Sequence, residues 1–257
     1  MREKLQDMAQ NLPFYRTVRG MKRGPQSGYS SWAYIRDKSY ALDPHHYVRA
    51  YLLIQKDLAR LFEYVEPSDL GASAYSYRMH ELLMRTCIEV EANFKAIFRA
   101  NGYKPRRFDI NAYRKVNVSH HLSSYEVALP IWDGEDRIFK PFQPWANGKP
   151  IGWYRAYNES KHDRHEAFKS ANLHALVTAV AGLLVLMTAQ FQTEDFSAGA
   201  SAILASGYDY HELEPALGSL FRIKYPDDWS DDEIYEFDWT ALSKEEVRFA
   251  KFDYNAL

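Results

Sequence analysis

The chain has 257 residues, of which 46% are hydrophobic and 26% are charged, and its formal net charge is −2. This apolar fraction excludes an intrinsically disordered chain, and the length allows one large domain whose core needs no disulfide bonds. The only cysteine, Cys87, has no partner for an intramolecular disulfide, which favours a reducing compartment, and we expect it to be a small core residue.

The charges are distributed unevenly along the chain. Residues 191–257 contain 15 acidic and 5 basic residues, whereas residues 1–190 contain 19 acidic and 27 basic residues. This asymmetry favours a basic working surface with an acidic appendage, although ordinary solvated surface explains it nearly as well. The segment from Met1 to Gly20 is charged and lacks the apolar core of a signal peptide, so we expect a cytoplasmic protein.

Residues 1–44 are expected to form a basic, irregular arm, because glycine, proline and serine residues interrupt any periodicity. Asp43 and Pro44 then predict the start of a helix, with the aspartate as N-cap and the proline at the first helical position. This helix is expected over residues 45–65, and Pro67 would end it.

The strongest helical pattern lies at residues 78–100, where apolar side chains recur at a spacing of three and four residues. Asn101 and Gly102 form a typical helix stop after it. A shorter helix is expected near residues 110–116. Residues 117–150 are rich in proline and glycine, and they predict a loop-rich insertion with one short hairpin.

Two further helices are expected, at residues 151–168 and at residues 170–192. The second has no charge between Lys169 and Glu194, and it is long enough to span a bilayer. Its alanine, threonine and glycine residues dilute its hydrophobicity, and the other helices offer matching apolar faces. We therefore favour a buried bundle helix and no membrane contact, with a membrane anchor as the alternative.

The remaining sequence predicts little regular structure. Residues 220–225 alternate in polarity and predict a short strand, and residues 230–233 form a capping box that predicts a short acidic helix. No internal repeat and no linker divides the chain. We therefore expect a single, mainly α domain over residues 1–257, with a four- to five-helix bundle at 45–192 and an acidic C-terminal extension at 193–257.

The most informative polar residues lie in the predicted helix 151–168. Arg155 and His162 would be two turns apart and only about 20° out of line. A histidine can transfer a proton near neutral pH, and an arginine can hold a phosphate with two parallel donors. Asn158 could orient the ribose or the phosphate between them. With RNA, the 2′-hydroxyl supplies the nucleophile, so no metal is required; the alternative is an exposed helix face held by ion pairs.

The same residues resemble a known family. Arg155 and His162, separated by six residues on the third long helix, together with the run from Tyr157 and Asn158 to Lys161 and His162, resemble the HEPN superfamily (higher eukaryotes and prokaryotes nucleotide-binding). The run is similar to a variant in uncharacterised bacterial proteins. The resemblance covers about residues 45–192. In the family a polar residue usually follows the arginine directly, whereas a non-polar residue does so in this chain, and the sequence departs from the family pattern there.

The resemblance implies a helical bundle that forms homodimers. Many members are metal-independent endoribonucleases of toxin, antiphage or RNA-processing systems, and others are inactive partners of nucleotidyltransferases. It therefore implies that RNA is the substrate and that a cognate neutralising protein is a partner. The implied catalytic residues, which would face their symmetry mates across a dimer cleft, are Arg155, Asn158, Lys161 and His162.

Other chemistries have less support. Glu159 and His162 have the spacing used by di-iron bundles, but such a site needs a second Glu-x-x-His motif, and the sequence has none. The other histidine pairs lack a partner at zinc-finger spacing. We therefore expect no metal ion and no cofactor. The sequence also lacks the G-x-S-x-G, Walker and G-x-G-x-x-G motifs of hydrolases and nucleotide-binding enzymes.

A cluster of basic and aromatic residues follows the helix at 78–100. Basic side chains would neutralise phosphates and aromatic rings could stack on unpaired bases, so the cluster predicts a nucleic-acid-binding surface. The alternative is a solvated surface whose aromatic rings turn inward. The basic residues are Lys104, Arg106, Arg107, Arg114 and Lys115, and the aromatic residues are Tyr103, Phe108 and Tyr113.

The leading hypothesis from the sequence is a HEPN-like, metal-independent endoribonuclease. His162 would be the acid–base group and Arg155 the phosphate clamp. The alternative from a different class is a non-catalytic protein that uses the same bundle to dimerise or to bind a partner.

Overall fold

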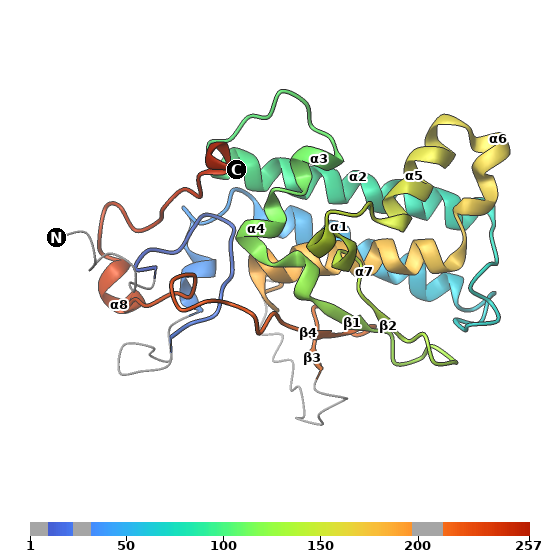
Figure 1. The fold of residues 1–257 in the computed structure, drawn as a ribbon. Helices are drawn as coiled ribbons and strands as arrows, with labels where there is room; N and C mark the ends of the chain where they lie inside the picture. The colour runs from blue at the N-terminus through green and yellow to red at the C-terminus, as the bar shows by residue number, and fades with distance from the viewer. Residues whose placement is uncertain (1–9, 23–31, 197–212) are drawn as a thin grey trace.

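The computed structural model describes residues 10–22, 32–196 and 213–257. Its centre is a set of packed helices: α1 (Pro44–Leu61), α2 (Tyr77–Ala100), α5 (Gly152–His162) and α7 (Leu173–Phe191). Helix α7 packs against each of the other three (Figure 1). The mainly helical architecture expected from the sequence is therefore confirmed.

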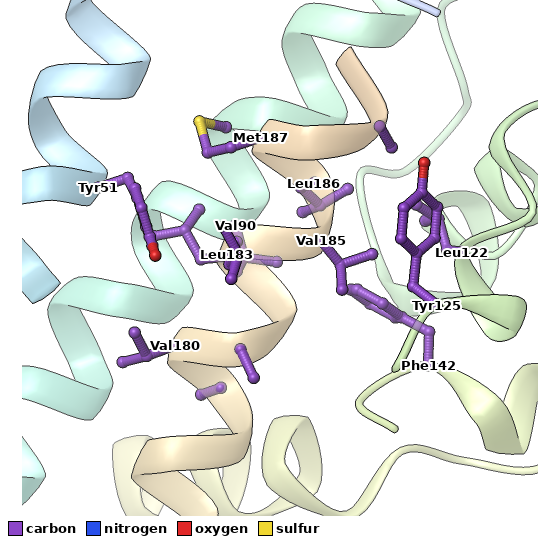
Figure 2. Packing of buried hydrophobic residues seen from close by; sticks show 14 of the residues in the cluster. Tyr51, Val90, Leu122, Tyr125, Phe142, Val180, Leu183, Val185, Leu186 and Met187 are labelled. Atoms are coloured by element: carbon purple, nitrogen blue, oxygen red, sulfur yellow. The ribbon is translucent and has the colours of Figure 1, made fainter. Parts of the chain in front are cut away.

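Helix α7 is the centre of the core. Figure 2 shows its apolar side chains between Tyr51 and Val90 on one side and Leu122, Tyr125 and Phe142 on the other. Among the described residues it is the one helix long and apolar enough to cross a membrane, yet 89% of its apolar window is buried inside the protein. A helix covered by protein over most of its surface is typical of a core helix, as the sequence favoured.

The boundaries of the first two long helices follow the local signals closely. The serine at the N-cap of α2 accepts a hydrogen bond from the amide of Met79, and the helix ends at Ala100 with Asn101 as its C-cap, which agrees with the predicted stop. Helix α1 begins with Pro44 at its first position but ends at Leu61, earlier than expected. Asp43 adopts a left-handed conformation (φ 46°) without a side-chain cap bond, so its expected capping role is wrong.

The predicted helix at 151–168 is not continuous. Asp163, with φ −134° and ψ 74°, ends α5, and its carboxylate accepts a hydrogen bond from the amide of Glu166 at 3.3 Å. It thereby caps the short helix α6 (Arg164–Ala167), which a 3₁₀ turn at Phe168–Ser170 follows. Aspartate side chains compete for backbone amides in this way, which explains a break that the apolar pattern did not reveal.

A small antiparallel sheet joins the insertion to the C-terminal segment. Its strands are β1 (Glu126–Ala128), β2 (Ile138–Phe139), β3 (Glu214–Pro215) and β4 (Arg222–Lys224), in the order β2-β1-β4-β3. The β1–β2 pair confirms the predicted hairpin, and β4 confirms the predicted strand. The expected single helix near 110–116 is two short ones, α3 (Ile110–Tyr113) and α4 (Val116–His120).

The last α-helix is the short α8 (Trp239–Leu242), and it is not the one that the sequence predicted. At the predicted capping box, Ser230 does bond the carboxylate of Glu233, but only a turn follows. The chain does not continue as a helix, because the amide of Tyr235 donates to the carbonyl of Gly20 and the amide of Lys22 donates to the carbonyl of Tyr235. Backbone pairing between distant segments replaces the expected helix here.

The described part of the predicted basic arm contributes to the core. Arg16 is 1% exposed, and its Nε donates to Oε1 of Gln190 at 2.7 Å. Arg19 is also buried, and its guanidinium lies against the rings of Phe14 and Trp229. The expected basic surface is therefore wrong at these two positions, because hydrogen bonds and ring faces allow both cations to be buried. Residues 1–9 and 23–31 of the arm lie outside the described residues.

Candidate functional site

Helix α5 separates its side chains into two faces. Its buried face is mainly aromatic, and its exposed edge carries Arg155, Glu159 and His162, with Asn158 partly exposed beside them. The predicted alignment of Arg155 and His162 along one side of the helix is confirmed.

Hydrogen bonds to the neighbouring helix fix the orientation of α5. The carboxylate of Glu91 on α2 accepts hydrogen bonds from the phenols of Tyr154 at 3.0 Å and Tyr157 at 3.3 Å. Burial and this carboxylate raise the pKa of Tyr154 above its usual range, so its phenol stays protonated and donates. On the other side, Nε1 of Trp153 donates to the carbonyl of Pro141 at 2.9 Å. These bonds determine which side chains α5 presents to solvent.

A small cavity of about 220 Å³ lies between α3, the 3₁₀ helix Gln143–Asn147 and the start of α5. Three cationic residues line it, namely Arg114, Lys149 and Arg155, and none of its lining residues is acidic. Asn158 lines it as well. This basic cavity therefore combines an excess of positive charge with an amide, which suits a phosphate-bearing ligand.

His162 lines a second hollow, of about 600 Å³, on the other side of Asn158. Three carboxylates line this hollow too, those of Glu159, Asp163 and Glu166. Asn158 is common to both hollows, so they are neighbours along the same edge of α5. The carboxylates lower the electrostatic attraction of the His162 hollow for a phosphate.

Arg155 and His162 do not open into the same hollow within one chain. Seven residues along a helix correspond to a rise of about 10 Å. Nε of Arg155 instead lies 3.4 Å from Oε1 of Glu159, and the side chains of this pair are 73% and 48% exposed. The predicted pair therefore shares one exposed edge, as expected, but the two side chains have different immediate neighbours.

Lys161, the fourth predicted site residue, lines neither of these hollows. Its Nζ donates to the phenol of Tyr157 at 3.2 Å and lies 5.1 Å from the centre of that ring. This hydrogen bond raises the pKa of Lys161. Its interactions are therefore with the α2-facing side of α5 rather than with the edge that carries Arg155.

Of the predicted nucleic-acid-binding residues, only Arg114 lines the basic cavity, and its guanidinium donates to the carbonyl of Gly148 at 3.1 Å. Lys104, Arg106 and Arg107 are not among its lining residues. Tyr113 is fully buried and stacks on another ring of the core. The alternative, that aromatic rings of this segment turn inward, is therefore correct for Tyr113.

Lys149, which lies in the loop that precedes α5, was not expected at the site from the sequence. Its only signal was its position beside a helix start, and its neighbour in space, Arg114, is distant in sequence. Lys115 belongs to an adjoining cavity of about 440 Å³ that also contains Arg114. The cationic surface therefore extends beyond the cavity itself.

The structure also bears on metal binding and on the chemistry of the single cysteine. Within residues 10–22, 32–196 and 213–257, no group of three or more histidine, cysteine, aspartate or glutamate side chains could hold a metal ion. Cys87 is fully buried, and burial raises the pKa of its thiol well above the usual value. Its predicted role as a core residue is confirmed.

No family model, curated protein or solved structure matches this chain. The case for a function therefore depends on the residues of α5 and on the cavities beside them.

Proposed function

We propose that the protein is a HEPN-like, metal-independent endoribonuclease that binds RNA along the exposed edge of α5. The observation that carries this proposal is the basic cavity, where Arg114 and Lys149 add to the charge of Arg155. Asn158 connects this cavity to the hollow of His162. A phosphate-binding group and a proton-transfer group are thus neighbours on one surface.

In the proposed reaction, the imidazole of His162 removes the proton from a ribose 2′-hydroxyl. The 2′-oxygen attacks the adjacent phosphorus, the bond from phosphorus to the 5′-oxygen breaks, and the proton passes to that leaving oxygen. Arg155 stabilises the charge that develops on the phosphate. The products are a 2′,3′-cyclic phosphate and a 5′-hydroxyl end.

The proposal includes a homodimer, because Arg155 and His162 of one chain open into different hollows. Pairing Arg155 of one copy with His162 of a second copy would bring both groups to one phosphate. It also includes a cytoplasmic location and a cognate neutralising protein, as the family resemblance implies.

The test is RNA cleavage by the purified protein in EDTA, with His162→Ala and Arg155→Ala beside the wild type. We expect cleavage by the wild type, ends with a cyclic phosphate, and a loss of at least a hundredfold in both variants. His165→Ala changes an exposed histidine on α6 and should retain full activity. If all four proteins cleave RNA only at the background rate, the proposed ribonuclease activity is excluded.

A second candidate is a non-catalytic RNA-binding protein. The carboxylates around His162 and the ion pair between Arg155 and Glu159 favour it, because both reduce the attraction of the edge for a reacting phosphate. It predicts RNA binding without cleavage, with Arg155→Ala weakening binding and His162→Ala leaving it unchanged. Measuring binding and cleavage on the same variants therefore separates the two functions.

A further inference from the structure

A larger cavity, of about 660 Å³, lies between the C-terminal half of α1 and the first turns of α2. It shares no residue with the cavities beside α5. Its apolar lining includes Leu61 and Val65 from the α1 side and Met79 and Leu82 from α2. Its volume is within the range of about 300–1,000 Å³ that is typical of small-molecule sites.

The mouth of this cavity is polar and carries an excess of positive charge. Three arginines and two carboxylates line it, and every carboxylate is already engaged. Asp57 is shared, because it pairs with Arg60 at 3.4 Å and also with Arg85. The other carboxylate, that of Glu81, forms an ion pair with Arg78, whose Nη1 lies 3.0 Å from Oε2 of Glu81. The cavity therefore has one positive charge more than negative charges, and this excess lies beside Asp57, which two arginines share.

An exposed aromatic ring accompanies this charge. Tyr64 also lines the cavity, and it is 83% exposed, whereas Met79 and Leu82 form a buried floor. An apolar floor beneath an exposed ring and a cationic rim matches a ligand with an apolar body and one negative charge. The pairing of guanidinium and carboxylate groups is strong and directional, so a carboxylate head group would determine how the ligand is oriented in the cavity.

We infer that this cavity binds a small amphipathic monoanion, with its carboxylate beside Arg60 and Arg85 and its apolar chain against Leu61 and Leu82. The site is independent of α5, so the inference does not depend on the ribonuclease proposal. It adds a small-molecule ligand to a protein whose basic cavity beside α5 suits a phosphate-bearing ligand.

The test uses octanoate as the anionic probe, with octan-1-ol as a neutral molecule of the same chain length and acetate as the head group alone. Titration calorimetry on the full chain should give one octanoate per chain. We expect octanol to bind at least fivefold more weakly and acetate to give no signal. Equal binding of octanol, or no binding of octanoate, would overturn the inference.

Two variants locate the site. Arg85→Gln should weaken octanoate binding at least fivefold, while Arg99→Gln, an exposed arginine near the other end of α2, should have no effect. Leu61→Trp fills the cavity and should abolish binding with little change in Tm. Amide chemical-shift changes on adding octanoate should lie within residues 57–65 and 76–85. Unchanged affinity in both cavity variants would show that the ligand binds elsewhere and would overturn the assignment.

Discussion

Arg155 and Glu159 form an ion pair one turn apart on α5, with Nε and Oε1 separated by 3.4 Å. The pair is exposed, so its own contribution to stability is small, about 0.3–0.5 kcal/mol. Its effect on binding is more important, because Glu159 engages a cation of the basic cavity.

Replacing Glu159 with glutamine should therefore strengthen RNA binding. We expect the dissociation constant to fall about twofold to fivefold at low salt and the difference to shrink as salt screens the charges. Fluorescence anisotropy at two salt concentrations would measure it. Glu63→Gln removes an exposed charge outside both α5 cavities and serves as control. Weaker RNA binding by Glu159→Gln would mean that the carboxylate contributes favourably to RNA binding and would contradict the prediction.

Glu91 should matter more for α5 than its neighbour Glu89. Removing the carboxylate in Glu91→Ala leaves the phenols of Tyr154 and Tyr157 without their acceptor, and we expect a loss of about 2 kcal/mol in the free energy of unfolding. Urea denaturation would measure this loss. Glu89→Ala is the control, because the Glu89 side chain does not bond these phenols. Equal losses in both variants would show that the phenol bonds contribute little.

Acid should destabilise the protein through His120. This side chain is fully buried, its Nε2 lies 2.9 Å from the carbonyl oxygen of Arg16, and burial lowers its pKa to about 3. The unfolded chain takes up the proton near pH 6.5, so the unfolded state binds more protons between these two values and stability falls as pH falls. Between pH 7 and pH 5, this one group should cost about 2 kcal/mol.

Urea denaturation at both pH values checks this prediction. In His120→Gln the part of the pH dependence that belongs to the imidazole should disappear, whatever the absolute stability of the variant. A pH dependence identical to that of the wild type would show that the imidazole is accessible to protons in the folded state.

Gly134→Ala should destabilise the loop beside β1 and β2. Gly134 has φ +133°, and an added Cβ would lie 2.1 Å from Oδ2 of Asp69. That carboxylate also accepts the indole N–H of Trp132 at 2.6 Å, so it cannot move freely. We expect a loss of about 2–3 kcal/mol, measured by urea denaturation. In contrast, Gly152→Ala meets nothing within 4 Å and should be neutral or stabilising. Similar stabilities for the two variants would contradict this account.

The sequence was informative wherever a local pattern decides the structure. The apolar spacing at 78–100 predicted α2 to within a residue, and the uncharged run after Lys169 predicted α7. The alternation at 220–225 predicted β4. On α5, helical geometry correctly predicted that Arg155 and His162 share one side of the helix.

What the sequence determined by itself is therefore the set of long helices and the composition of each of their faces, because both follow from neighbours three or four residues apart. Only the tertiary structure decided that Arg16 is buried against Gln190, that Lys149 joins Arg114 and Arg155 around one cavity, and that Asp57 faces two arginines. These arrangements depend on residues far apart in the chain, whose distances are set by how the helices pack rather than by any local preference.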